Sequence, residues 1–353
     1  MRLRAPRVKV KPALFFLLVS SSVLFYIAVD VPIAYPMPQQ CEPFPLEKAA
    51  AMRSLYKKKG QWDAAKKIKK LAKKCLPPDH TLMIYAANNT PENLDFKQGF
   101  NVFEYVNFLF DGKTGMPAEM EANFETVRPQ KKCAVIGNSG ILLGSGCGKE
   151  IDTQYDFVMR SNIAPIKQFA KDVGIKTNFT IINLETVRTL YNLLARDKSD
   201  PETLAAVEKI RFLNDSIVWY PKGVRFRFYA RMRLQTVARK LKDEYKLLIR
   251  IGYSWRTLAA IIKWFWSLDE YYTTTGLNLY TIATTFCDEI TLYGFYPFHV
   301  DSNGRSIQYH YYEDIPYKYE NNVHDFPAEF RHLKELESIG GLKLVTSKCK
   351  QPE

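Results

Sequence analysis

From residue 133 onward, short apolar runs that are typical of buried strands alternate with longer segments of helical composition. The strand-like runs are Ala134–Ile136, Phe157–Met159, Thr180–Ile182, Ile217–Tyr220 and Ile290–Tyr293. The helical segments are Leu184–Arg196, Pro201–Ile210, Ala230–Lys242, Trp255–Ser267 and Leu277–Cys287. Because alternating strands and helices build parallel sheets covered on both faces, the sequence predicts one Rossmann-like α/β domain with a single parallel sheet.

The N-terminus has the pattern of a membrane anchor. Residues 1–12 carry five basic residues and no acidic one, and the apolar run Ala13–Val29 follows. A basic flank stays in the cytoplasm, and no good cleavage site follows the run. The sequence therefore predicts a cytoplasmic tail at 1–12, a transmembrane signal anchor at 13–29, a lumenal stem at 30–80 and a lumenal globular domain at 81–353.

The net charge of +13 is concentrated near the N-terminus. Residues 1–80 hold 16 Lys and Arg against 5 Asp and Glu, whereas the remainder holds 34 against 32. This distribution argues against a nucleic-acid partner. A local basic stripe over Lys222–Lys263, with 12 basic residues against Asp243 and Glu244, is suited to an anionic acceptor.

The six cysteines favour disulfides over a zinc site, because none has CxxC spacing and the predicted compartment is oxidising. Sequence alone does not select among the fifteen full pairings. Three N-glycosylation sequons agree with a lumenal location. Their acceptor residues are Asn88, Asn178 and Asn214.

A glycine-rich turn follows the first predicted strand of the globular domain. Glycines let a backbone approach a ligand, and a helix N-terminus behind them offers N–H groups to a phosphate. The turn lacks GxGxxG, so it does not match the dinucleotide-binding fingerprint. A strand-turn-helix without a ligand is the alternative, but Asn138 and Asn162 add amides suited to reading a base, a sugar or a carboxylate.

Two further blocks carry chemistry later in the chain. Thr274, Thr275 and Gly276 open a predicted helix and offer hydroxyl and N–H groups to an anion, or serve only as an N-cap. His310 and His324 lie among aromatic and acidic residues that can orient a ring. The other histidines are expected to be structural, and these are His80, His299 and His332.

These blocks resemble the sialyl motifs of the animal sialyltransferase family, most closely its α2,8-linking branch. Cys133–Asn183 is similar to the long motif, Thr273–Phe298 to the short motif, His310–Asp314 to the third and His324–Phe330 to the very short one. The resemblance covers roughly residues 81–350. It implies a variant of the GT-A glycosyltransferase fold and CMP-sialic acid as the donor substrate.

The resemblance also implies roles for single residues. The residues implied to bind the donor are Asn138, Asn162, Thr274, Thr275, Gly276 and Tyr296. Tyr296 stands where the family usually has tryptophan, and Ser161 replaces a common cysteine. His324 would be the catalytic base, because a histidine pKa lies near the working pH. His310 would donate to the departing phosphate, where negative charge develops.

Two disulfides are implied in the same way, Cys133–Cys287 and Cys147–Cys349. Cys41 and Cys75 lie outside the motifs. Three alternatives stay open for them: a local pair, pairing between chains, or free thiols. The chain contains no Asp-x-Asp. We therefore expect no metal site and no cofactor, as the resemblance implies metal-independent chemistry.

The sequence thus predicts an α2,8-sialyltransferase that acts, with inversion, on a sialylated glycoprotein or glycolipid. We expect a single-pass type II protein of the Golgi membrane, and leave a homodimer open. The alternatives are a polysialyltransferase, a sialyltransferase that attacks galactose or N-acetylgalactosamine, and, from another class, an inactive glycan-binding membrane protein.

Overall fold

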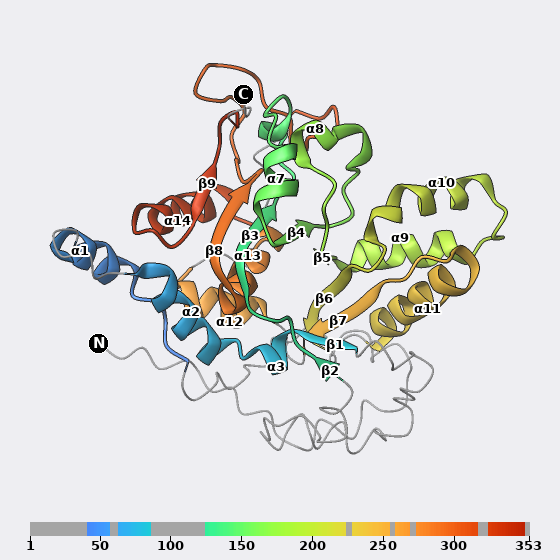
Figure 1. The fold of residues 1–353 in the computed structure, drawn as a ribbon, viewed down its shortest axis with the longest axis horizontal. Helices are drawn as coiled ribbons and strands as arrows, with labels where there is room; N and C mark the ends of the chain where they lie inside the picture. The colour runs from blue at the N-terminus through green and yellow to red at the C-terminus, as the bar shows by residue number, and fades with distance from the viewer. Residues whose placement is uncertain are drawn as a thin grey trace, which may run out of the picture. The chain divides into compact units, whose positions relative to one another are not determined.

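The computed structural model describes residues 41–56, 63–85, 124–223, 228–254, 258–268, 273–316 and 324–349 (Figure 1). The predicted anchor at 13–29 and the sequon at Asn88 lie outside these ranges. Within them, no helix is both long enough and apolar enough to cross a membrane.

The described residues form one nine-stranded sheet in the order β2-β1-β7-β6-β5-β4-β3-β8-β9. The strands are β1 (Met83–Tyr85), β2 (Phe124–Glu125), β3 (Gln130–Ile136), β4 (Phe157–Ser161), β5 (Phe179–Ile181), β6 (Ile217–Gly223), β7 (Arg250–Ser254), β8 (Cys287–Tyr293) and β9 (Lys343–Val345). All pairs from β7 to β9 are parallel, and β1 is antiparallel to both of its neighbours. The prediction of a single parallel sheet is confirmed from β7 to β9, whereas β1 and β2 add an antiparallel edge that it did not include. Its five strand-like runs fall in β3, β4, β5, β6 and β8, the run at Thr180–Ile182 overlapping β5 by two residues.

Helices cover both faces of this sheet. They are α1 (Leu46–Tyr56), α2 (Ala64–Cys75), α3 (Pro78–Thr81), α7 (Gly148–Gln154), α8 (Ala170–Val173), α9 (Leu184–Leu194), α10 (Pro201–Ile210), α11 (Phe228–Tyr245), α12 (Ala259–Trp266), α13 (Thr275–Phe286) and α14 (Phe326–Ser338), with short 3₁₀ turns η3 (Gly140–Leu142), η4 (Lys167–Phe169) and η5 (Arg211–Leu213). On one face of β3, Ala134 and Ile136 pack in a core with Ile151 of α7. α13 packs against β3, β4 and β8. Because both faces of β3 are covered, every residue of Cys133–Ile136 is buried.

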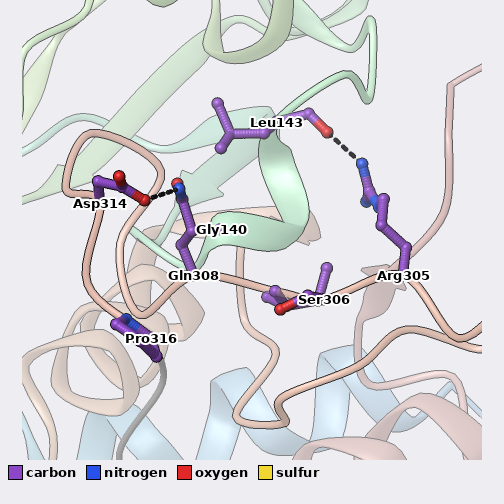
Figure 2. A pocket seen from close by; sticks show the side chains of 8 residues that line it. Gly140, Leu143, Arg305, Ser306, Gln308, Asp314 and Pro316 are labelled. Carbon is purple, nitrogen blue, oxygen red and sulfur yellow. Dashed lines mark hydrogen bonds between the residues drawn. The ribbon is translucent and has the colours of Figure 1, made fainter.

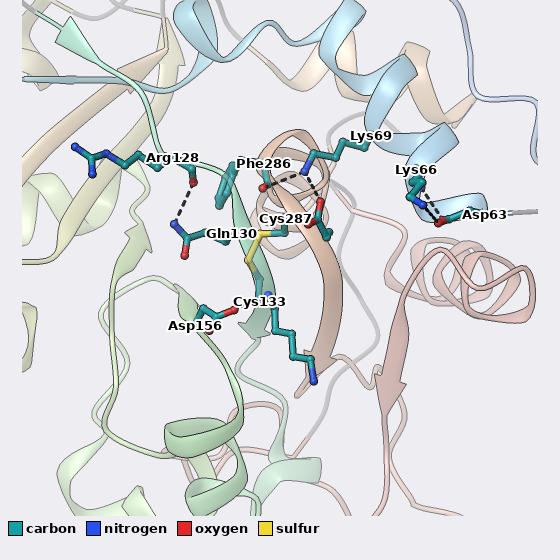
Figure 3. A network of polar contacts seen from close by, with 11 residues as sticks. Asp63, Lys66, Lys69, Arg128, Gln130, Cys133, Asp156, Phe286 and Cys287 are labelled. Atoms are coloured by element: carbon teal, nitrogen blue, oxygen red, sulfur yellow. Dashed lines mark hydrogen bonds and ion pairs between the residues drawn. A yellow bond between two sulfur atoms is a disulfide. The ribbon is translucent and has the colours of Figure 1, made fainter.

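The Lys-rich segment of the predicted stem belongs to the folded domain. α2 buries Ile68 and Ala72 against α13 and β8, and Lys69 donates from Nζ to the Phe286 carbonyl at 3.2 Å and pairs with Asp288 at 2.7 Å (Figure 3). Upstream of α1, the Phe44 N–H donates to a carbonyl of α12 at 2.7 Å. The predicted boundary at residue 80 is therefore wrong for the described residues from 41 onward. Lysines dominate this helix and hide its narrow apolar stripe.

All six cysteines are in disulfides. The pairs are Cys41–Cys75, Cys133–Cys287 and Cys147–Cys349. The last two are the pairs that the resemblance implies, and Cys41 and Cys75 form the local pair among their alternatives. The Cys133–Cys287 bond links the middle of β3 to the first residue of the adjacent strand β8 (Figure 3).

His332 behaves as a core residue, as expected from the sequence. Its ring packs edge-on against Trp266, with the centroids 5.0 Å apart. Burial lowers the pKa of His332 to about 4, so the ring is neutral at neutral pH.

We predict that α2 is required for folding. A chain starting at residue 38 should fold, whereas one starting at residue 81 loses the apolar contacts of α2 and the Cys41–Cys75 bond, and should not. In the longer chain, Ile68→Ala should lower the free energy of unfolding by about 2–5 kcal/mol, measured by denaturant unfolding. The control Lys70→Ala, on the exposed face of α2, should change it by less than about 0.5 kcal/mol. Equal stability of the two chains would contradict the revised boundary.

Candidate functional site

The site lies where the chain reverses direction across the sheet. From β3 the chain moves to β4 on one side, whereas β8, which arrives much later, lies on the other. In open α/β sheets, ligands bind beyond the carboxyl ends of the strands at such a switch point. The loops that follow β3 and β8 are therefore the first place to look for a ligand site.

These two loops are joined by close backbone contacts. The Gly137 N–H donates to the Tyr293 carbonyl at 2.7 Å, and the Ser139 N–H donates to the Gly294 carbonyl at 3.1 Å. The Ser139 hydroxyl adds a bond to the Tyr296 carbonyl at 2.8 Å. A Cβ at Gly137 would lie 2.5 Å from the Gly294 oxygen, so only glycine permits this approach. The long and short motifs thus form one surface.

Asn138 and Asn162 follow the neighbouring strands β3 and β4. The Asn138 side-chain amide donates to the Ser161 carbonyl at 3.0 Å. Asn162 is left-handed, with φ 58°, and its Oδ1 is buried without a hydrogen-bond partner among the described residues. A buried acceptor without a donor is costly unless a ligand supplies one. This geometry suits Asn162 to receive a ligand N–H or hydroxyl.

The N-terminus of α13 approaches the same loops. Thr274 is its N-cap and accepts the Leu277 N–H at 3.0 Å. A Cβ at Gly276 would lie 2.7 Å from the Phe295 ring, so the first turn of α13 packs closely on the loop after β8. The first-turn N–H groups, including those of Thr275 and Gly276, have no partners within the helix and suit an anion.

Glu329 of α14 holds this helix start, a contact that the sequence analysis missed. Its buried carboxylate accepts the Thr274 N–H at 2.6 Å and the Thr274 hydroxyl at 2.5 Å. Thr274 therefore positions α13 and directs its hydroxyl to Glu329. The only signal for this in the sequence is that Glu329 lies five residues after His324, inside the very short motif.

His310 lies at the turn of a hairpin over residues 308–316. Its Nδ1 is 2.8 Å from Glu313 Oε2, and its ring stacks on Tyr312 at 5.0 Å between centroids. The Glu313 contact fixes the ring and leaves Nε2 on the opposite side. Burial raises the pKa of Tyr312 to about 12, so this neighbour is uncharged. The Tyr311 N–H donates to the Asn138 carbonyl at 2.9 Å, which seats the hairpin beside the long motif.

His324 lies just before Asp325, the N-cap of α14, and a series of ring contacts connects it to His310. The His324 ring lies 5.7 Å from Phe326, Phe326 lies 6.4 Å from Tyr309, and Tyr309 lies 4.2 Å from His310. The fold thus brings both histidines to one neighbourhood from segments that are separate in sequence.

Tyr296 is placed among aromatic side chains. Its ring packs edge-on against Phe298 at 5.1 Å and Phe330 at 5.8 Å. Its hydroxyl donates to the Val300 carbonyl at 2.8 Å. Tyr296 therefore offers a ring beside the Ser139 loop, while its hydroxyl is bound to main chain.

The remaining candidate residues lie away from this edge or are engaged in the fold. Asn178 and Asn214 accept main-chain N–H groups with Oδ1, Asn178 half-buried and Asn214 exposed. Part of the Lys222–Lys263 stripe also contacts the protein itself, because Lys240 donates to the Leu194 carbonyl at 2.6 Å and Arg233 lies over the Tyr191 ring.

Comparisons with known proteins find a family model, a relative and two solved structures that are similar to this chain. A family model described as glycosyltransferase family 29 (sialyltransferase) matches residues 80–341. An alpha-N-acetylneuraminide alpha-2,8-sialyltransferase from Xenopus tropicalis is 31% identical over 297 residues, which cover 80% of this chain and 79% of the relative. A mammalian sialyltransferase structure is 21% identical, covers 76% of this chain and 90% of its own, and has a TM-score of 0.43. A second, in complex with Gal-beta-1-3GalNAc-ortho-nitrophenol, is 18% identical, covers 92% and 94%, and has a TM-score of 0.41.

We predict that Glu329 supports ligand binding through Thr274. Glu329→Ala should lower the free energy of unfolding by about 1–3 kcal/mol, because two buried donors lose their acceptor, and should weaken CMP binding. Denaturant unfolding and CMP titration measure the two effects. Glu335→Ala, an exposed change on the same helix, is the matched control and should alter neither. CMP affinity equal to that of the wild type in Glu329→Ala would contradict the positioning role.

Proposed function

Because the chain belongs to glycosyltransferase family 29, the sialyltransferases, we propose that it transfers sialic acid in α2,8 linkage to a sialylated glycan. Its membership makes it a glycosyltransferase that uses CMP-sialic acid. The linkage rests on one observation, the 31% identity to an alpha-2,8-sialyltransferase over four fifths of the chain. The proposed acceptor is a glycoprotein or glycolipid whose glycan already ends in sialic acid.

The proposed reaction is a single displacement. An acceptor hydroxyl oxygen attacks the anomeric carbon of the donor sialic acid and forms the new glycosidic bond. At the same time, the bond between that carbon and the phosphate oxygen of CMP breaks. His324 takes the hydroxyl proton, and CMP leaves with the bonding electron pair. Attack opposite the leaving group converts a β-linked donor into an α-linked product.

His310 would assist the departing CMP. Its Nδ1 is occupied by Glu313, so Nε2 is the atom that can donate to the phosphate as negative charge grows. The N–H groups at the start of α13 would support the same anion, and Asn138 and Asn162 would orient the nucleotide and sugar. Because a phosphate monoester is a good leaving group at neutral pH, the mechanism includes no metal and no cofactor.

Three alternatives to this function can be compared with the structure. Attack on galactose or N-acetylgalactosamine is the nearest rival, since the family model does not itself fix a linkage. Polysialylation would use the Lys222–Lys263 stripe, part of which is engaged within the fold. An inactive glycan-binding protein would not need the catalytic roles that we propose for His310 and His324.

We propose a Golgi membrane protein of type II orientation, in line with the predicted anchor.

The first prediction from the proposed function concerns turnover. The protein, mixed with CMP-sialic acid and EDTA, should release CMP faster when a sialylated acceptor is present than when an asialo acceptor is, and the product should contain an α2,8 linkage. CMP release and linkage analysis of the product measure this. No acceptor-dependent release would refute the transferase activity. Transfer only to asialo acceptors would refute the linkage, and loss of activity in EDTA would refute the metal-free mechanism.

The second prediction concerns His324. His324→Ala should bind CMP as tightly as the wild type while kcat falls by a factor of about 10²–10⁴, because general base catalysis is lost. CMP titration and steady-state kinetics separate the two effects. His299→Ala, at an exposed position after β8, is the matched control and should retain turnover. A His324→Ala variant with normal kcat would show that another group takes the proton.

A further inference from the structure

We infer that a cavity beside the His310 hairpin is a subsite for the acceptor, in which Arg305 binds the carboxylate of an acidic sugar. This inference rests on the proposed function and extends it to acceptor selection. The cavity has a volume of about 360 Å³, within the range of small-ligand sites. It is lined by residues that the donor set does not include.

The cavity lies between the long motif and the hairpin (Figure 2). One side is formed by Gly140 and Leu143 of the glycine-rich turn. The other sides are lined by residues of the later segment, namely Arg305, Ser306, Gln308 and Asp314. The Gly140 N–H donates to the Gln308 carbonyl at 3.2 Å, which closes the base. Because Gln308 and Asp314 flank His310 on the same hairpin, a sugar in this cavity would lie near the reacting groups.

Arg305 is held in place with donors to spare. Its Nε donates to Asp301 at 3.0 Å and its Nη1 donates to the Leu143 carbonyl at 2.7 Å. The pKa of Asp301 is lowered, mainly because Asp301 accepts the Arg305 main-chain N–H, so this anchor stays ionised. Among the described residues, these bonds use two of the five guanidinium N–H groups. The others can pair with a carboxylate, which matches the planar guanidinium.

The opposite wall suits hydroxyl groups. Asp314 accepts from the Gln308 side chain at 3.0 Å, and Figure 2 shows it on the side of the cavity away from Arg305. One cation and one acid on opposite walls favour a ligand with a single carboxylate and several hydroxyls. An acidic sugar has this chemistry, whereas a phosphate cluster does not.

The residues that line the cavity differ from those proposed to bind the donor. The donor candidates follow β3, β4 and β8 or open α13, and the Asn138 side chain is directed to β4 through the Ser161 carbonyl. The cavity is lined by Gly140 and Leu143 of the turn and by residues 305–316, and none of the donor candidates lines it. Since a sialic acid carboxylate occurs in both substrates, this separation assigns Arg305 to the acceptor.

The test compares an acceptor that carries the sialic acid carboxylate with one in which that carboxylate is an uncharged carboxamide. Wild type should show kcat/KM about tenfold higher for α2,3-sialyllactose than for its sialic carboxamide, and Arg305→Gln should reduce this ratio to near one. The KM for CMP-sialic acid should stay within about twofold. Arg211→Gln, which breaks a similar exposed pair with Glu208, is the matched control and should keep the wild-type ratio.

Two kinetic results would overturn the inference. One is a ratio that Arg305→Gln leaves unchanged, and the other is an effect confined to the donor KM. Binding of sialyllactose against lactose to the CMP-loaded protein, by calorimetry, gives a readout without turnover. A preference for sialyllactose that Arg305→Gln abolishes would support the subsite even if the proposed linkage were wrong. Equal binding of the two sugars would refute it.

Discussion

The pairing of β3 with β8 is the contact on which the rest of the site depends. These strands are adjacent in the sheet but far apart in the chain, and the Cys133–Cys287 bond links the middle of β3 to the first residue of β8. At the carboxyl ends of both strands, Gly137 and Gly294 allow the following loops to touch. A covalent bond within the strands and backbone contacts beyond their carboxyl ends fix the relative position of two loops that carry candidate ligand-binding residues.

Two smaller contacts attach the histidine segments to this frame. The Tyr311 N–H bonds to Asn138, so the His310 hairpin follows the loop after β3. Glu329 bonds to Thr274, so α14, which His324 precedes, is fixed relative to α13. Each histidine segment is thus attached to a different half of the candidate site. Their relative position depends on the β3–β8 pairing between those halves.

Much of the fold could be predicted because buried parallel strands leave continuous apolar runs, as at Ala134–Ile136. β7 (Arg250–Ser254) was missed because a charged, a glycine and a serine residue interrupt its pattern. α2 was assigned to a solvated stem because its surface lysines outnumber the residues that it buries. The Glu329–Thr274 bond and the cavity at Arg305 are tertiary contacts, and no local pattern encodes which distant residue an acid will meet. Sequence motifs identified the residue types of the site, whereas the structure identified their partners.

The disulfides also constrain how the chain can be made. Cys133 and Cys287 are separated by 154 residues, Cys147 and Cys349 by 202, and the two loops interleave. During synthesis, Cys147 emerges soon after Cys133 but has no correct partner until the last strand has been translated. It must remain reduced while Cys287 appears and pairs with Cys133. Oxidation that is too early would join Cys133 or Cys147 wrongly, so correct biogenesis needs a compartment that delays or reshuffles thiol pairing until β9 is in place.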